Sequence, residues 1–203
     1  MTFNALRPVA TRVIDPLADF FIKYEVSPDT VSIVSLICAF FAGLSFYLSP
    51  EYKDLTLLAG ILVVFNSLFD ALDGVIARKS NRATPRGDFL DHVIDRYSDI
   101  FIICSIFFAG YVSWQIGVVA IVGVLLTSYL GTQAQALNLG RYYGGIMGRA
   151  DRLVVIIIAA FSGSIHPASI MGFTILGWAV ILIAVTSHIT AIQRIFYIWK
   201  RLD

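Results

Sequence analysis

The sequence predicts an all-α integral membrane protein with six transmembrane helices and an amphipathic juxtamembrane helix at the N-terminus. Of the 203 residues, 58% are hydrophobic and only 14% are charged, whereas soluble domains carry about 25% charged residues. The hydrophobic residues fall into runs of roughly the 20 residues that a bilayer requires. These observations favour a single domain over residues 1–203 that crosses a membrane several times.

Residues 1–25 have the pattern of an amphipathic helix in the membrane interface. Apolar side chains recur at helical spacing with charged side chains between them. Pro16 is expected to bend this helix or to begin a second segment. The following sequence SPDT is typical of a helix start, with Ser27 or Asp29 as the capping residue. The apolar positions are Leu6, Val9, Val13, Leu17, Phe20 and Phe21.

Six apolar runs then form the predicted bundle over residues 30–197. The fifth run is short because His166 and Pro167 end it, and its start is expected to include residues 149–152. The predicted spans are 30–49, 55–75, 88–111, 114–137, 150–165 and 169–197.

The distribution of Lys and Arg predicts the orientation in the membrane. Basic residues concentrate before span one, after spans two and four, and in the C-terminal tail, while the opposite loops contain only Lys53. Because cytoplasmic loops are rich in basic residues, we expect both termini on the cytoplasmic face of the cell membrane. The net charge of +1 gives no argument for nucleic-acid binding. Cys38 and Cys104 lie in apolar runs and are expected to act as small buried hydrophobes.

Residues 70–95 contain four aspartates between strongly apolar segments. Asp70 and Asp73 are three residues apart, and Asp91 and Asp95 are four apart, so each pair lies on one helix face. The intervening loop lets the two faces converge, where four carboxylates would repel one another. Divalent cations relieve that repulsion, and oxygen-only ligands favour Mg²⁺ or Mn²⁺. Four carboxylates can hold two ions about 3.5–4 Å apart, a geometry suited to phosphoryl transfer.

Two other interpretations of these aspartates remain open from the residues alone. The aspartates are either helix caps and surface charges at the membrane edge, or they line a cation pathway as in a transporter. The neighbouring residues favour a phosphate-bearing ligand instead. Gly74 leaves room for close approach, Arg78 can pair with a phosphate, and Thr84 offers a hydroxyl. A transporter has no evident need for this set.

The aspartates and their neighbours form one motif, Asp70-x-x-Asp73-Gly74-x-x-Ala77-Arg78, eight residues, Gly87-x-x-x-Asp91-x-x-x-Asp95. The motif resembles the signature of the CDP-alcohol phosphotransferase family at every fixed position. Within that family, the chain looks most like the prokaryotic phosphatidylinositol-phosphate synthases and the archaeal archaetidylinositol-phosphate synthases.

The resemblance implies a divalent-metal-dependent enzyme of phospholipid synthesis. It transfers a phosphatidyl-type group from a CDP-linked lipid to the hydroxyl of a polar acceptor and releases CMP. The motif match makes Asp70, Asp73, Asp91 and Asp95 the metal ligands, with Asp95 also the general base, and the family implies a homodimer. The implied CDP-lipid-binding residues are Asp29, Ser32, Gly74, Arg78 and Thr84.

Arginines near the ends of the later spans either bind the acceptor or follow from the bias of cytoplasmic span ends toward basic residues. Arg149, Arg152 and Arg194 suit a phosphorylated acceptor because guanidinium groups bind phosphate with two parallel hydrogen bonds. Arginines at similar places in the inositol-phosphate subgroup support this interpretation. Inositol 1-phosphate is the first choice, glycerol 3-phosphate the second, and a free alcohol such as inositol or serine the third.

The chain departs from that subgroup around the acceptor site. After Ser128-Tyr129, the subgroup has a Lys-x-Arg-x-Glu pattern, whereas this chain has Gly131 and neutral amides. Gln133 and Gln135 either hydrogen-bond a polyol or are satisfied inside the bundle. His92 is expected to face away from the metals, and Gly148 stands where the subgroup usually has glutamate.

Overall fold

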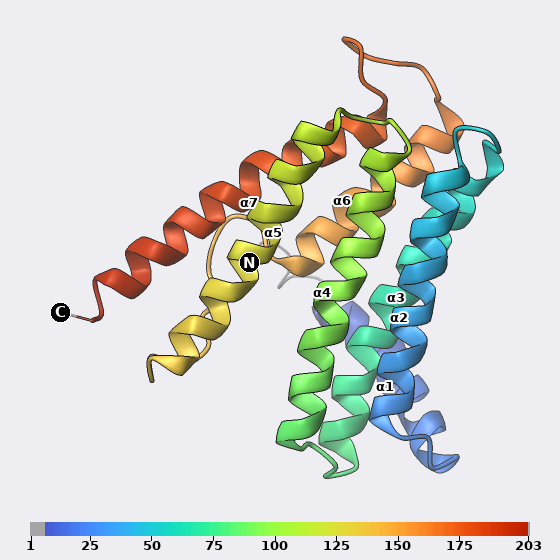
Figure 1. The fold of residues 1–203 in the computed structure, drawn as a ribbon. Coiled ribbons are helices and arrows are strands. Elements are labelled where there is room, and N and C mark those ends of the chain that lie inside the picture. Colours follow the sequence, from blue (N-terminus) through green and yellow to red (C-terminus); the bar gives the residue numbers. More distant parts are fainter. Residues whose placement is uncertain (1–6, 203) are drawn as a thin grey trace.

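The computed structural model describes residues 7–202, with side chains from residue 14 onward, and it is helical throughout apart from the connections and a single β-bridge (Figure 1). The prediction of an all-α protein is therefore confirmed. The helices are α1 (Arg7–Lys23), α2 (Pro28–Leu48), α3 (Asp54–Lys79), α4 (Pro85–Phe108), α5 (Trp114–Ala136), α6 (Arg149–Ile165) and α7 (Ile175–Trp199).

Helix α1 is one continuous helix with Pro16 inside it. It packs against α3, and Lys79 on α3 holds it through an ion pair with Asp19 at 2.9 Å. Phe20 is 55% exposed, while Leu17 and Phe21 pack against a small cluster formed by Ala18, Val31, Leu72 and Ile76. The predicted apolar positions Leu6, Val9 and Val13 lie outside the described side chains.

Four helices, α2, α3, α5 and α7, are long and apolar enough to cross a membrane. Helix α4 carries the charges of the aspartate motif, and α6 has 17 residues, which is about 26 Å at 1.5 Å per residue. Exposed apolar side chains such as Phe40, Phe41 and Leu182 cover the outer surface, as expected for contact with lipid rather than water. The chain is thus a multi-pass membrane protein in which four spans meet the criteria of length and composition.

The predicted start of the last span was wrong. Residues 169–174 are not helical, and α7 begins at Ile175 with Thr174 as its cap, whose hydroxyl accepts a hydrogen bond from the Gly177 amide at 3.1 Å. Met171 and Gly172 have φ values of 51° and 87°, which turn the chain back before the helix starts. The other predicted ends agree more closely. The largest difference is at the end of span two, which was predicted at residue 75, whereas α3 ends at Lys79.

Helices α2, α3 and α4 are joined by polar contacts in an otherwise apolar core. The fully buried Asn66 on α3 donates from Nδ2 to the Ser35 carbonyl oxygen at 3.0 Å and to Ser35 Oγ at 2.8 Å. The same Nδ2 lies 3.4 Å from Ser98 Oγ on α4. Because Asn66 is one turn before Asp70, these bonds fix the register of the motif helices.

The connections between helices alternate between the two ends of the bundle (Figure 1). One end carries the turns after α2, α4 and α6. The other end carries the start of α2, the α3–α4 turn, the loop at residues 137–148 between α5 and α6, and the end of α7. All residues predicted for the site lie toward this second end.

Candidate active site

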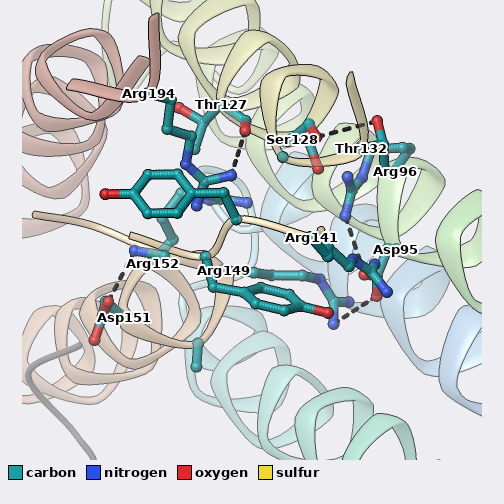
Figure 2. Close-up of a pocket in the computed structure, with 15 residues that line it drawn as sticks. Asp95, Arg96, Thr127, Ser128, Thr132, Arg141, Arg149, Asp151, Arg152 and Arg194 are labelled. Atoms are coloured by element: carbon teal, nitrogen blue, oxygen red, sulfur yellow. Dashed lines mark hydrogen bonds and ion pairs between the residues drawn. The ribbon is translucent and has the colours of Figure 1, made fainter. Parts of the chain in front are cut away.

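The two aspartate pairs converge between α3 and α4. A single guanidinium nitrogen, Arg149 Nη1, donates to Asp70 Oδ2 at 2.6 Å and lies 2.7 Å from Asp95 Oδ1. Figure 2 shows Arg149 and Asp95 side by side. Asp70 and Asp91 also lie close enough to Asp73 for their charges to interact. The helical spacing therefore brings carboxylates from both helices into one cluster, as the sequence predicted.

Three carboxylates of the cluster, those of Asp70, Asp73 and Asp95, differ in their contacts. Asp73 is buried and accepts a hydrogen bond from Ser32 Oγ at 2.5 Å. Asp95 has only 13% of its side chain exposed, and Arg96 Nη2 lies 3.0 Å from its Oδ2. Asp70 Oδ1 is buried and has no hydrogen-bond partner among the described residues, and Asp95 Oδ1 has only the ion pair with Arg149.

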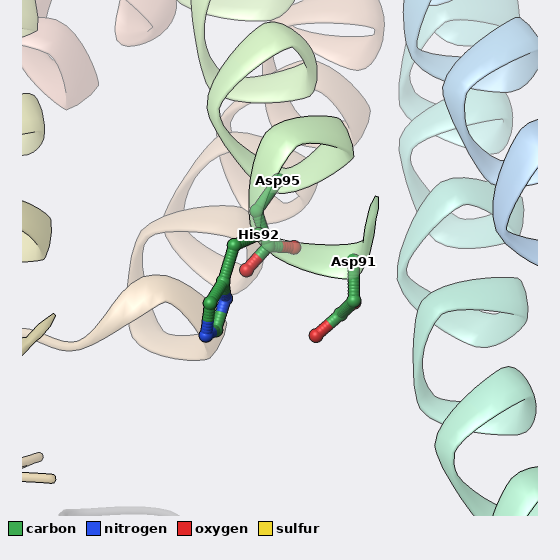
Figure 3. Close-up of side chains that lie close together, drawn as sticks. All are labelled: Asp91, His92 and Asp95. Atoms are coloured by element: carbon green, nitrogen blue, oxygen red, sulfur yellow. The ribbon is translucent and has the colours of Figure 1, made fainter. Parts of the chain in front are cut away.

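The unpartnered oxygen of Asp70 is the feature that suits a metal ion. A buried carboxylate oxygen without a partner is costly, and hard divalent cations bind such oxygens preferentially. Asp91, His92 and Asp95 each place one potential ligand atom within 4.8 Å of the others (Figure 3). The donor set of the cluster therefore fits Mg²⁺ or Mn²⁺.

His92 does not face away from the cluster, contrary to the prediction. Its ring lies beside Asp91 and Asp95 (Figure 3), and its Nδ1 is 2.8 Å from Arg141 Nη2. The α5–α6 loop, which supplies Arg141, carries no periodic pattern, so the sequence offered no signal for this contact.

A first cavity, which we call the motif cavity, has a volume of about 310 Å³. The residues predicted for CDP-lipid binding all line it. Thr84 caps α4 by accepting from the Gly87 amide at 3.1 Å, and Arg78 lies over Gly74, where an added Cβ would be 3.3 Å from its Nη1. The predicted residues are Asp29, Ser32, Gly74, Arg78 and Thr84, and Asp73 and Asp91 line the same cavity.

A second cavity, which we call the arginine cavity, has a volume of about 350 Å³ (Figure 2). Asp95 lines it, together with the three arginines predicted for the acceptor and two that were not predicted. These arginines are Arg96, Arg141, Arg149, Arg152 and Arg194.

The three predicted arginines have different surroundings. Arg149 points its guanidinium at Asp70 and Asp95, as described above. Arg152 is 2% exposed and pairs with Asp99, with Nη2 at 2.9 Å from Oδ2. Arg194 donates to backbone carbonyls, from Nη1 to Thr127 at 2.6 Å and from Nε to Gly144 at 2.9 Å.

Gly131, which seemed only to remove charge from the site, has a steric role. A Cβ added there would lie 2.7 Å from Arg194 Nη1, so the missing side chain leaves room for that guanidinium. Gln133 and Gln135 do not line the arginine cavity.

Comparison with known proteins decides the family. The CDP-alcohol phosphatidyltransferase family matches residues 25–185. The chain belongs to this family. The enzyme class that the aspartate motif predicted is therefore confirmed, because the match covers most of the chain, including the whole motif cavity and all residues of the arginine cavity except Arg194.

Similar proteins agree with this assignment. The archaetidylinositol phosphate synthase of Methanothermobacter thermautotrophicus is 33% identical over 98% of this chain and 95% of its own length. The phosphatidylinositol phosphate synthase of Streptomyces avermitilis is 31% identical over 93% of this chain and 79% of its own length.

Solved structures of the Mycobacterium tuberculosis phosphatidylinositol phosphate synthase share the fold. The structure with CDP-DAG bound superposes with a TM-score of 0.77 and 26% identity, covering 93% of this chain and 94% of that chain. The structure in complex with manganese and citrate gives a TM-score of 0.78 and 25% identity, covering 92% and 89%.

Proposed function

We propose that the protein transfers a phosphatidyl-type group from a CDP-linked lipid to the hydroxyl of inositol 1-phosphate and releases CMP. The observation that carries this proposal is the pairing of two adjacent cavities, one built from the aspartate motif and the other lined by five arginines and Asp95. The names of the similar proteins, an archaetidylinositol phosphate synthase and a phosphatidylinositol phosphate synthase, support the same acceptor.

The motif cavity is the proposed donor site. Arg78 supplies a cation for the diphosphate, and Gly74 leaves space beside it. The CDP-DAG complex of the Mycobacterium tuberculosis enzyme supports this kind of donor.

Asp70, Asp73, Asp91 and Asp95 are the residues that would hold two divalent ions, Mg²⁺ or Mn²⁺. Bound there, the ions would neutralise the diphosphate and the charge that builds on the departing CMP. The manganese complex of the similar enzyme supports metal dependence.

Asp95 is the proposed general base. Asp91 lines the motif cavity and Asp95 lines the arginine cavity, and one helical turn separates them. The acceptor oxygen bonds to the lipid-side phosphorus, the bond between that phosphorus and the CMP oxygen breaks, and the acceptor proton passes to Asp95. Arg96 and Arg149 hold this carboxylate from two sides, which favours the positioning that proton transfer requires.

The charge of the arginine cavity supports a phosphorylated acceptor. Five arginines stand against Asp95 and Asp151 in its lining, so an anion is favoured over a neutral alcohol. Glycerol 3-phosphate has the same charge chemistry and is the second candidate.

The membrane arrangement belongs to the same proposal. We infer that α4 and α6 complete six spans, because the helix connections alternate between the two ends. The basic loops at the site end support a cytoplasmic active site, and a reporter fused after Asp203 tests this orientation. The homodimer stays a prediction, testable by mass measurement of the protein in nanodiscs.

A panel of acceptors tests the function. Purified protein receives CDP-diacylglycerol or CDP-archaeol with Mg²⁺, together with inositol 1-phosphate, glycerol 3-phosphate, inositol or serine. We expect CMP release when inositol 1-phosphate is combined with whichever of the two donor lipids the protein uses. Release only with a neutral alcohol would contradict the acceptor assignment.

A further inference from the structure

Two residues of the α5–α6 loop, Arg141 and Tyr143, line both cavities. The two cavities therefore meet at this loop. Transfer requires the attacking oxygen to approach within about 3–3.5 Å of the phosphorus. If the donor occupies the motif cavity and the acceptor the arginine cavity, their reacting ends meet beside these two residues.

The Arg141 guanidinium is held at this junction from the α4 side. Its Nη2 is 2.8 Å from His92 Nδ1, and its Nη1 is 3.4 Å from Asp88 Oδ1. It also lies over the Tyr143 ring, 5.1 Å from the ring centroid. A guanidinium has five N–H donors, so these contacts leave donors free for phosphate oxygens.

The other arginines of the arginine cavity are more fully engaged. Arg149 and Arg96 contact aspartates of the cluster, Arg152 pairs with the buried Asp99, and Arg194 donates to backbone carbonyls. In contrast, the one ion pair that Arg141 makes among the described residues is with Asp88, whose side chain is 57% exposed, and the distance between them is long at 3.4 Å. When the shortest ion pair of each of the four arginines in that set that pair with a carboxylate is compared, that of Arg141 is therefore the longest and has the most exposed partner, and Arg141 lies where the two cavities join.

We propose that Arg141 binds phosphate at the reaction point, contacting both the diphosphate of the donor and the phosphate of the acceptor. This inference rests on the proposed function. An arginine in this place offsets the repulsion between the two anions and stabilises the charge that shifts onto CMP as the bond breaks. His92 is a positioning residue for it, because its Nδ1 accepts from the guanidinium.

The test compares Arg141→Gln and Arg141→Lys with the wild-type enzyme in the CMP assay. We expect Arg141→Gln to lower kcat by about 100-fold, the effect typical of removing one preorganised donor. The KM values of both substrates should rise, and Arg141→Lys should recover part of the loss because it keeps the charge. Arg86→Gln is the matched control, since Arg86 is an exposed arginine of α4 that lines neither cavity.

A binding measurement keeps the proposal testable if Arg141→Gln has no measurable turnover. Calorimetry gives the affinity for CDP with and without inositol 1-phosphate. In the wild-type enzyme, we expect inositol 1-phosphate to change the affinity for CDP at least about fivefold, the lower end of typical coupling between sites. In Arg141→Gln, inositol 1-phosphate should leave the affinity for CDP unchanged.

Two results would overturn the role of Arg141. One is a rise in the KM of a single substrate with unchanged kcat, and the other is unchanged coupling in the calorimetry. Failure of the proposed function itself looks different, because the wild-type enzyme would then release no CMP with any phosphorylated acceptor.

Discussion

Replacing Arg149 with glutamine should make the protein depend on a divalent metal for its stability. In the structure, Arg149 Nη1 lies 2.6 Å from Asp70 Oδ2 and 2.7 Å from Asp95 Oδ1, and only 15% of the Arg149 side chain is exposed. This guanidinium is thus the cation that compensates the aspartate cluster. A metal ion bound by the same carboxylates must compete with it.

The size of the effect follows from the burial of these groups. Removing one partner of a buried ion pair costs about 3–5 kcal/mol. Asp70 and Asp95 have 23% and 13% of their side chains exposed, so we expect a loss at the lower limit, about 3 kcal/mol of unfolding free energy without metal. Metal binding relieves the same repulsion in Arg149→Gln. If it recovers about 3 kcal/mol, the variant should bind the metal roughly 100-fold more tightly than the wild type does.

Two measurements on purified protein check this expectation. Thermal unfolding is followed in EDTA and in Mn²⁺, and Mn²⁺ affinity is measured by electron paramagnetic resonance. Arg152→Gln is the matched control, because Arg152 lies one turn along α6 and pairs with Asp99 rather than with the four motif aspartates. It should lose stability in both conditions and keep its Mn²⁺ affinity. Equal Mn²⁺ affinity in Arg149→Gln and the wild type would refute the reasoning.

Three further substitutions test other parts of the account. Asp95→Asn should lower turnover by about 10²–10⁴-fold by removing the base while CDP binding persists; near-normal turnover would show that Asp95 is not the base. Gly131→Ala should raise the acceptor KM about tenfold, the worth of roughly one hydrogen bond, because its Cβ would lie 2.7 Å from Arg194 Nη1. Equal increases in both KM values would argue against this local effect. Asn66→Leu should lower the unfolding free energy by about 1–3 kcal/mol through loss of its bonds to Ser35, and an unchanged unfolding curve would contradict that.

The aspartate cluster was predictable because its information is local. Spacings of three and four place Asp70 with Asp73 and Asp91 with Asp95 on helix faces, and a short turn joins the two helices. The helix start near residue 28 was predictable for the same reason, with Ser27 or Asp29 as its cap. In the structure the cap is Ser27, whose Oγ accepts from the Thr30 amide at 3.1 Å.

Features that depend on loops or on the packing of several helices could not be predicted from the sequence. The contacts of Arg149 depend on how the start of α6 packs beside α3 and α4. The sequence shows only that an arginine stands near the end of a span and does not show which carboxylates it pairs with. Arg141 lies in the non-helical loop at residues 137–148, where hydrophobic periodicity gives no information. The start of α7 was misplaced because Ile170, Met171 and Phe173 continue the apolar run through a turn that only the backbone reveals.

Transfer to inositol 1-phosphate is tested by following both products of one reaction, CMP and the lipid. Purified protein is supplied with CDP-diacylglycerol or CDP-archaeol, Mg²⁺ and inositol 1-phosphate, with Asp95→Asn as the blank. We expect one CMP for each phosphorylated inositol lipid formed, and neither product without the acceptor or in the blank. CMP release that does not depend on a phosphorylated acceptor, or no release with either donor, would contradict the proposed transfer to inositol 1-phosphate.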